Sequence, residues 1–139
     1  MANSDNVIRA GLTPKLRDIP NLISNLTYTA SPSSEHIVKP LSVSQSSTLY
    51  DPPIPEFSVI QVKLPTRGKE CHDGIRGPSI VIVTEGKGKV SWADEGLDIG
   101  LGDVFFVGAE TRIELEANGV GELVIYRAFV QIDGGAASV

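Results

Sequence analysis

The sequence contains one cysteine, Cys71, among its 139 residues, so it has no disulfide framework and fits a reducing compartment, the cytoplasm. Long apolar runs are also missing. The longest, "IVIV" and "VFFVGA", are far shorter than the roughly 20 residues that a transmembrane helix needs. The first residues, "MANSDN", lack a basic start followed by an apolar segment. We therefore expect no signal peptide and no membrane partner.

Positive charge is scarce, since 12 Lys and Arg stand against 17 Asp and Glu and give a net charge of −5. Nucleic acids and anionic membranes require a cationic face, so this balance argues against both as partners. The cations are scattered apart from one small cluster of Arg9, Lys15 and Arg17 near the start of the chain. A cluster of that size can hold one phosphate group but not a polymer.

Residues for common catalytic sites are few. The chain has two histidines, His36 and His72, and no serine in a nucleophile-elbow sequence. The segment "EGKGKV" is interpreted as a hairpin turn, because it does not match the phosphate loop G-x-x-x-x-G-K. Adjacent carboxylates such as Asp94 and Glu95 lie in expected turns. None of these residues predicts a catalytic site.

The segment "DIPNLISNL" predicts the one helix, with Asp18 as its N-cap and Pro20 in the first turn. A short strand is expected just before it, over residues 6–10. From residue 57 onward, strand patterns recur every eight to twelve residues with turns between them. This spacing indicates an all-β sandwich or barrel. Side chains expected to face inward are Ile60, Val62, Leu64, Ile113 and Leu115.

Two segments, "VIVTEGKGKV" and "LGDVFFVGAETRIEL", resemble the two sequence motifs of cupins. The resemblance implies a cupin-like jelly-roll β-barrel or sandwich with one short N-terminal helix. We expect a single domain over residues 1–132. It would consist of a strand–turn–helix lead-in (1–28), a Ser- and Pro-rich connection (29–56) and the β-barrel (57–132), followed by a flexible tail (133–139).

Metal-binding cupins place two histidines and a carboxylate in the first motif and a histidine in the second. By resemblance these positions fall at about His72, Gly74, Ser79 and Ile113. Only His72 could ligate a metal, because the other three residues lack a suitable donor. We therefore expect no metal and no other cofactor in this chain. His72 and its neighbour Cys71 are interpreted as ordinary surface or core residues.

The opening "SDNVIRAGLTPKLRDIPNLISNLTY", with "YDPPIPEFSV", "VFFVGAET" and "YRAF" in the same order, resembles type I mannose-6-phosphate isomerase. The resemblance covers about residues 1–130 and points to the C-terminal cupin domain of that zinc enzyme. It implies that Arg9 is the catalytic arginine and that Lys15 binds the substrate phosphate. The family's zinc ligands have no counterpart here, so we expect the chain by itself to be inactive and the zinc-binding catalytic domain to be its partner.

An alternative interpretation is a stand-alone cupin module that binds sugars or sugar phosphates like a lectin. Arg9 and an exposed aromatic side chain such as Trp92 would then contact the sugar. Under either interpretation the isolated chain exposes apolar surface and open strand edges, which allow it to form a homodimer.

Overall fold

A computed structural model describes residues 8–9 and 14–131 of the chain, which divides into two units, one ending at Ile37 and the other beginning at Val38. Most of the strand predicted over residues 6–10 lies outside the described residues. Ile8 and Arg9 are described and are not in a strand. The tail predicted over residues 133–139 also lies outside the described part.

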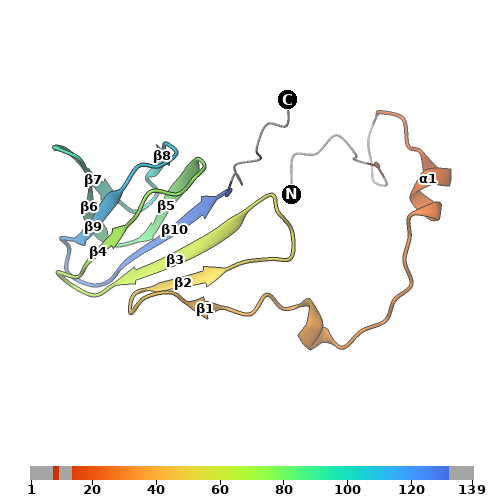
Figure 1. Ribbon diagram of the computed structural model, residues 1–139, viewed down its shortest axis with the longest axis horizontal. Helices are drawn as coiled ribbons and strands as arrows, with labels where there is room; N and C mark the ends of the chain where they lie inside the picture. The colour runs from red at the N-terminus through yellow and green to blue at the C-terminus, as the bar shows by residue number, and fades with distance from the viewer. Residues whose placement is uncertain (1–7, 10–13, 132–139) are drawn as a thin grey trace, which may run out of the picture. The chain divides into compact units, whose positions relative to one another are not determined.

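The first unit contains the predicted helix, α1 (Ile19–Ser24), which is confirmed (Figure 1). Asp18 is its N-cap, since one carboxylate oxygen accepts a hydrogen bond from the Asn21 backbone N–H at 3.2 Å. A short 3₁₀ helix, η1 (Ser33–His36), follows it. None of the residues of α1 is buried, and Ile19 and Ile23 are more than half exposed. The apolar side chains of this helix thus have little core to pack against among the described residues.

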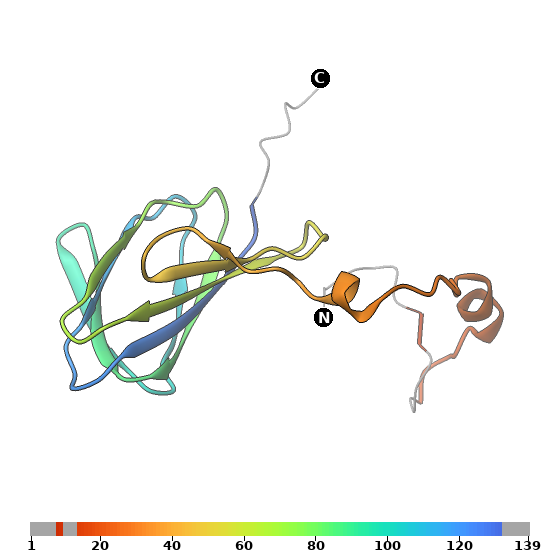
Figure 2. The same ribbon diagram turned by 90° about the horizontal axis from the view of Figure 1, so that it is seen from below.

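The second unit is a sandwich of two antiparallel sheets (Figures 1 and 2). One sheet has six strands in the order β1 (Leu41–Ser42), β2 (Ser47–Tyr50), β3 (Ser58–Leu64), β10 (Leu123–Phe129), β5 (Ser79–Glu85) and β8 (Val104–Val107). The other has four strands in the order β4 (Lys69–His72), β9 (Ile113–Ala117), β6 (Lys87–Trp92) and β7 (Glu95–Gly100). The predicted fold class, all-β with one short N-terminal helix, is confirmed.

The core lies between the sheets and follows the period-two alternation of the strands. Val62 and Leu64 of β3 are fully buried, and Ile113 and Leu115 of β9 are 2% exposed. Ile60 is partly buried and packs against the same cluster. The inward-facing side chains predicted for these two strands are therefore confirmed.

Two local predictions differ from the structure. Strand β2 lies within residues 29–56, so part of the predicted surface connection belongs to the sheet, where β2 pairs with β3. The turn at Gly86 is not a hairpin turn, because β5 and β6 belong to different sheets. Gly86 has a φ of +80°, and a Cβ there would lie 2.2 Å from the Glu122 carbonyl oxygen. Glycine thus lets the chain turn sharply from one sheet into the other.

In the described part of the chain, both helices are too short to cross a membrane.

Candidate functional site

Arg9 and Lys15, the two site residues predicted from the sequence, belong to the first unit, and both side chains are exposed. Residues 10–13, which separate them, lie outside the described residues. Lys15 comes just before α1, whose N-cap is Asp18. Both cations are thus accessible to an anionic ligand from solvent.

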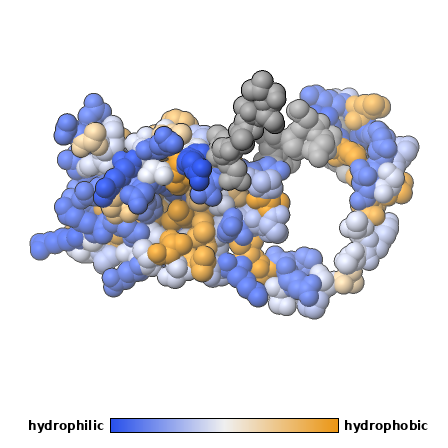
Figure 3. Space-filling model, in the orientation of Figure 1, coloured by the Kyte–Doolittle hydropathy of each residue, from blue (hydrophilic) through white to orange (hydrophobic). Residues whose placement is uncertain are grey.

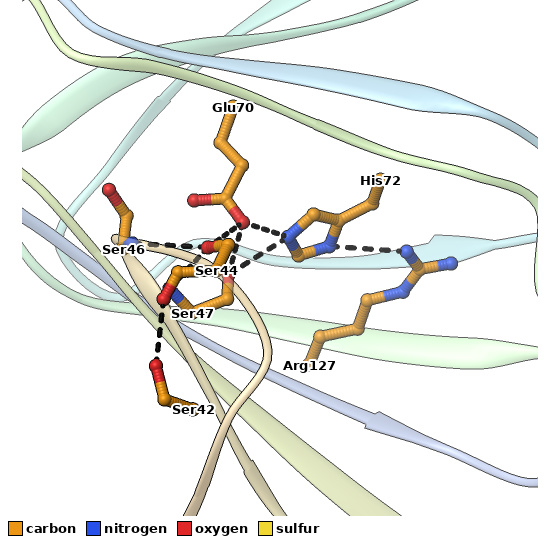
Figure 4. A network of polar contacts seen from close by, with 7 residues as sticks. All are labelled: Ser42, Ser44, Ser46, Ser47, Glu70, His72 and Arg127. Carbon is orange, nitrogen blue, oxygen red and sulfur yellow. Dashed lines mark hydrogen bonds and ion pairs between the residues drawn. The ribbon is translucent and has the colours of Figure 1, made fainter.

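A network of polar side chains that the sequence analysis did not predict lies inside the sandwich (Figure 4). Its centre is His72, which projects inward from β4 between a carboxylate and a guanidinium. The His72 Nε2 atom is 3.3 Å from Glu70 Oε1, and its Nδ1 atom is 3.5 Å from Arg127 Nη1. We call Ser47, Glu70, His72, Ser79 and Arg127 the inner polar network.

Serine hydroxyls complete the inner polar network at both ends, and Figure 4 shows the end at Glu70. The Ser47 hydroxyl donates to Glu70 Oε1 at 2.5 Å, and Arg127 Nε donates to the Ser79 hydroxyl at 3.0 Å. Glu70 and His72 come from the four-stranded sheet, whereas Ser47, Ser79 and Arg127 come from the six-stranded sheet. The network therefore links the two sheets through the core.

The position of Arg127 determines which ring nitrogen of neutral His72 carries the hydrogen. A guanidinium can only donate, so the Nδ1 atom that faces it must accept, and the hydrogen of a neutral ring then sits on Nε2 and points toward Glu70. Burial lowers the pKa of His72, and the Arg127 charge lowers it further, while the nearby Glu70 carboxylate partly opposes the shift. His72 is therefore neutral at physiological pH.

Arg127 is the least expected member of the network, since it is 1% exposed. Burial lowers its pKa, and among the described residues its Nη2 atom has no hydrogen-bond partner. Its position has a signal in the sequence: in "LVIYRAF" it falls on the same alternating face as Leu123 and Ile125, both of which are buried. An arginine at a core-facing position of a strand indicates buried polar partners.

The inner polar network does not fit a zinc ion. Both ring nitrogens of His72 are engaged, and a divalent cation there would be repelled by the Arg127 guanidinium. Ser79 accepts a hydrogen bond from Arg127, and Ile113 lies in the apolar core. No three His, Cys, Asp or Glu side chains of the described residues gather in a way that could hold a metal.

Protonation of His72 should make the fold sensitive to mild acid. Its folded-state pKa lies below its ordinary value of 6.5, so the unfolded chain takes up a proton more readily. The contribution of His72 to stability is then complete above pH 6.5 and is lost as pH falls below that value. We expect the melting temperature to drop between pH 7.5 and pH 5, and the His72→Gln variant to show a smaller drop.

The control for this prediction is His36→Gln, which changes an exposed histidine whose Nε2 contacts the Ser31 hydroxyl at 2.7 Å. It should keep the wild-type pH dependence. Melting curves recorded by the fluorescence of Trp92, the only tryptophan, would measure both variants. An unchanged pH dependence in His72→Gln would contradict this description of the network.

Trp92, the aromatic side chain named above for a lectin-like site, is partly rather than fully exposed. It is partly buried against the core and lines a mostly apolar cavity of about 330 Å³ together with Phe105, Leu97 and Ile113. Sugar-binding sites present an aromatic face together with polar partners. In this cavity the one polar side chain is Thr111, whereas a second cavity of about 270 Å³ places Trp92 beside Ser91, Arg112 and Glu114.

Comparison with known sequences points to one enzyme family. Residues 47–95 match the family model "Phosphomannose isomerase type I C-terminal". Over 94% of its length the chain is similar to the mannose-6-phosphate isomerases of Ogataea parapolymorpha and Cryptococcus neoformans, with 45% and 44% identity. It spans 32% and 30% of the length of these two relatives, about a third.

Solved structures agree with the sequence comparison. The crystal structure of mannose 6-phosphate isomerase from Salmonella typhimurium, bound to substrate and a zinc atom, superposes with a TM-score of 0.73 and 30% identity. The match covers 95% of the present chain and 32% of that one. The likeness in fold therefore extends over nearly the whole sequence described above.

Proposed function

We propose that the chain is the C-terminal domain of a type I phosphomannose isomerase and acts in that enzyme, because it is similar to mannose-6-phosphate isomerases over about a third of their length. The reaction is the interconversion of mannose 6-phosphate and fructose 6-phosphate. The observation that carries the proposal is 45% identity over 94% of the chain, a span that includes the segment with Arg9 and Lys15. This segment precedes the cupin-like sandwich in the sequence.

Arg9 and Lys15 have chemistry that suits a hexose phosphate. A lysine ammonium binds a phosphate dianion as a point charge, and an arginine stabilises negative charge that develops on a substrate oxygen. Both side chains are exposed in the first unit, which supports a role in a pocket completed by other residues. Arg9 is proposed as the catalytic arginine and Lys15 as the phosphate-binding residue.

The other half of this pocket would come from the zinc-binding part of the isomerase, which has no counterpart in the present sequence. The zinc site is assigned to that part, because the inner polar network does not fit the metal. We expect the chain by itself to be inactive. Its single cysteine, Cys71, forms no disulfide bond, which is consistent with an enzyme that acts on sugar phosphates in the cytoplasm.

A hybrid enzyme tests the proposed function. The present chain would replace the matching C-terminal third of the Ogataea parapolymorpha isomerase, with which it shares 45% identity. The hybrid should isomerise mannose 6-phosphate in a coupled assay, whereas the purified chain alone should show neither turnover nor stoichiometric zinc. Turnover by the chain alone would contradict the division of the site proposed here.

A further inference from the structure

The outer face of the six-stranded sheet carries an uninterrupted apolar row. Cross-strand pairing places its members side by side over five strands, from β8 at the edge to β2. The members of the row are Phe106, Ile80, Ala128, Val59 and Tyr50. Phe106 is 68% exposed and Ile80 is 56% exposed, so large apolar side chains at one end of the row face solvent.

A second row beside the first has no charged member either. Pairing aligns Val104, Ile82, Tyr126, Gln61 and Thr48 across the same five strands. Val104 is 60% exposed and Ile82 is 42% exposed. We call these two rows the apolar face. In the view of Figure 3, hydrophobic side chains gather over the sheet around β3 and β10.

The outer face of the four-stranded sheet has the opposite character. Its corresponding row is Lys69, Glu116, Lys89 and Asp98, in which charges alternate in sign across four strands. Lys69 Nζ and Glu116 Oε2 lie 2.9 Å apart. The outer face of the four-stranded sheet is therefore suited to contact with solvent. Of the two outer faces, the one that carries the apolar rows belongs to the six-stranded sheet.

The apolar face is also hollowed. A depression of about 250 Å³ lies over the ends of β5, β8 and β10, lined by Phe57, Pro78, Ile80, Phe106 and Phe129 among others. A hollow of this kind can receive side chains of a packed neighbour. Contiguous apolar surface of this kind on a folded domain usually marks a contact with another protein surface.

We infer that the apolar face packs against the zinc-binding part of a mannose-6-phosphate isomerase, an inference that rests on the function proposed above. The present chain spans about a third of its relatives, so a partner roughly twice its size belongs to the same enzyme. Domains of one chain bury apolar surface where they meet. The apolar face then holds the sandwich against the domain whose pocket receives Arg9 and Lys15.

Cysteine labelling tests this contact directly. Phe106→Cys and Ile80→Cys would be made in a Cys71→Ser background, both in the isolated chain and in the hybrid enzyme. Labelling by a maleimide, followed by peptide mass spectrometry, measures how accessible each position is. Both cysteines should react rapidly in the isolated chain and at least tenfold more slowly in the hybrid.

Val120→Cys is the matched control, because Val120 is a fully exposed apolar residue outside the apolar face. It should react equally fast in both proteins. Equal reaction of Phe106→Cys and Ile80→Cys in an active hybrid would overturn the inference and leave the proposed function intact. An inactive hybrid that still protects both positions would support the contact and contradict the function.

Two other occupants of the apolar face are distinguished by the same experiment. A second copy of the chain would protect both cysteines in the isolated chain at high protein concentration but not in the hybrid. A segment of this chain itself would protect them in the isolated chain at every concentration. Either result would overturn the inference.

Discussion

Replacing Arg9 with alanine in the hybrid enzyme is expected to lower kcat for mannose 6-phosphate about 100-fold or more. A loss of this size is typical when a group that stabilises negative charge in the transition state is removed. Arg9 is exposed and belongs to the first unit, whereas the residues that form the buried core belong to the second. The substitution should therefore reduce turnover without changing the melting temperature. Steady-state kinetics and a thermal melt of the same preparation would measure both effects.

Two further variants, at Lys15 and Arg17, show whether the loss of turnover is specific to Arg9. Lys15→Ala should chiefly raise KM, because a phosphate contact contributes to binding of the substrate and the transition state alike. Arg17→Ala is the control, since Arg17 belongs to the same small cluster of cations and is also exposed. It should change the kinetics little. If Arg9→Ala and Arg17→Ala behave alike, the role proposed for Arg9 is wrong.

The second large effect is expected at Arg127. Replacing it with alanine should lower the free energy of unfolding by about 3 kcal/mol or more, because a large buried side chain and its hydrogen bonds are lost together. The change leaves Ser79 and the Nδ1 atom of His72 without their donor and opens a cavity in the core. Urea denaturation, followed by Trp92 fluorescence, would measure the loss.

Arg112→Ala provides the control for Arg127. Arg112 is an exposed arginine whose Nε donates to Cys71 Sγ at 2.9 Å and lies 3.8 Å from Asp73 Oδ1. Its removal should change stability little, because surface contacts of this kind are solvated. A loss in Arg127→Ala no larger than in Arg112→Ala would show that the inner polar network is not a main support of the fold.

Regular patterns made much of the sandwich predictable. Strands such as β3 and β9 alternate strictly, so their buried side chains, Val62 and Ile113 among them, could be read from the sequence. The helix was predictable because Asp18 and Pro20 are typical of a helix start. Strand β2 was missed because "STLY" lies in a Ser-rich segment and shows little alternation of polar and apolar residues.

The inner polar network was missed for a different reason. Its members lie on four strands, and sequence spacing does not show that Glu70 and His72 face Arg127 across the core. The inward position of Arg127 was visible in the alternation of "LVIYRAF", but its partners were not. The roles proposed for Arg9 and Lys15 came from the family resemblance, because local pattern alone indicates only a small cationic cluster.

The central claim is that this chain forms the C-terminal part of a working isomerase. The most direct test compares kcat/KM for mannose 6-phosphate in three proteins: the Ogataea parapolymorpha enzyme, the same enzyme without its C-terminal third, and the hybrid. We predict that the shortened enzyme is at background and that the hybrid lies within about tenfold of the parent. A folded hybrid that binds zinc but stays at background would contradict the claim.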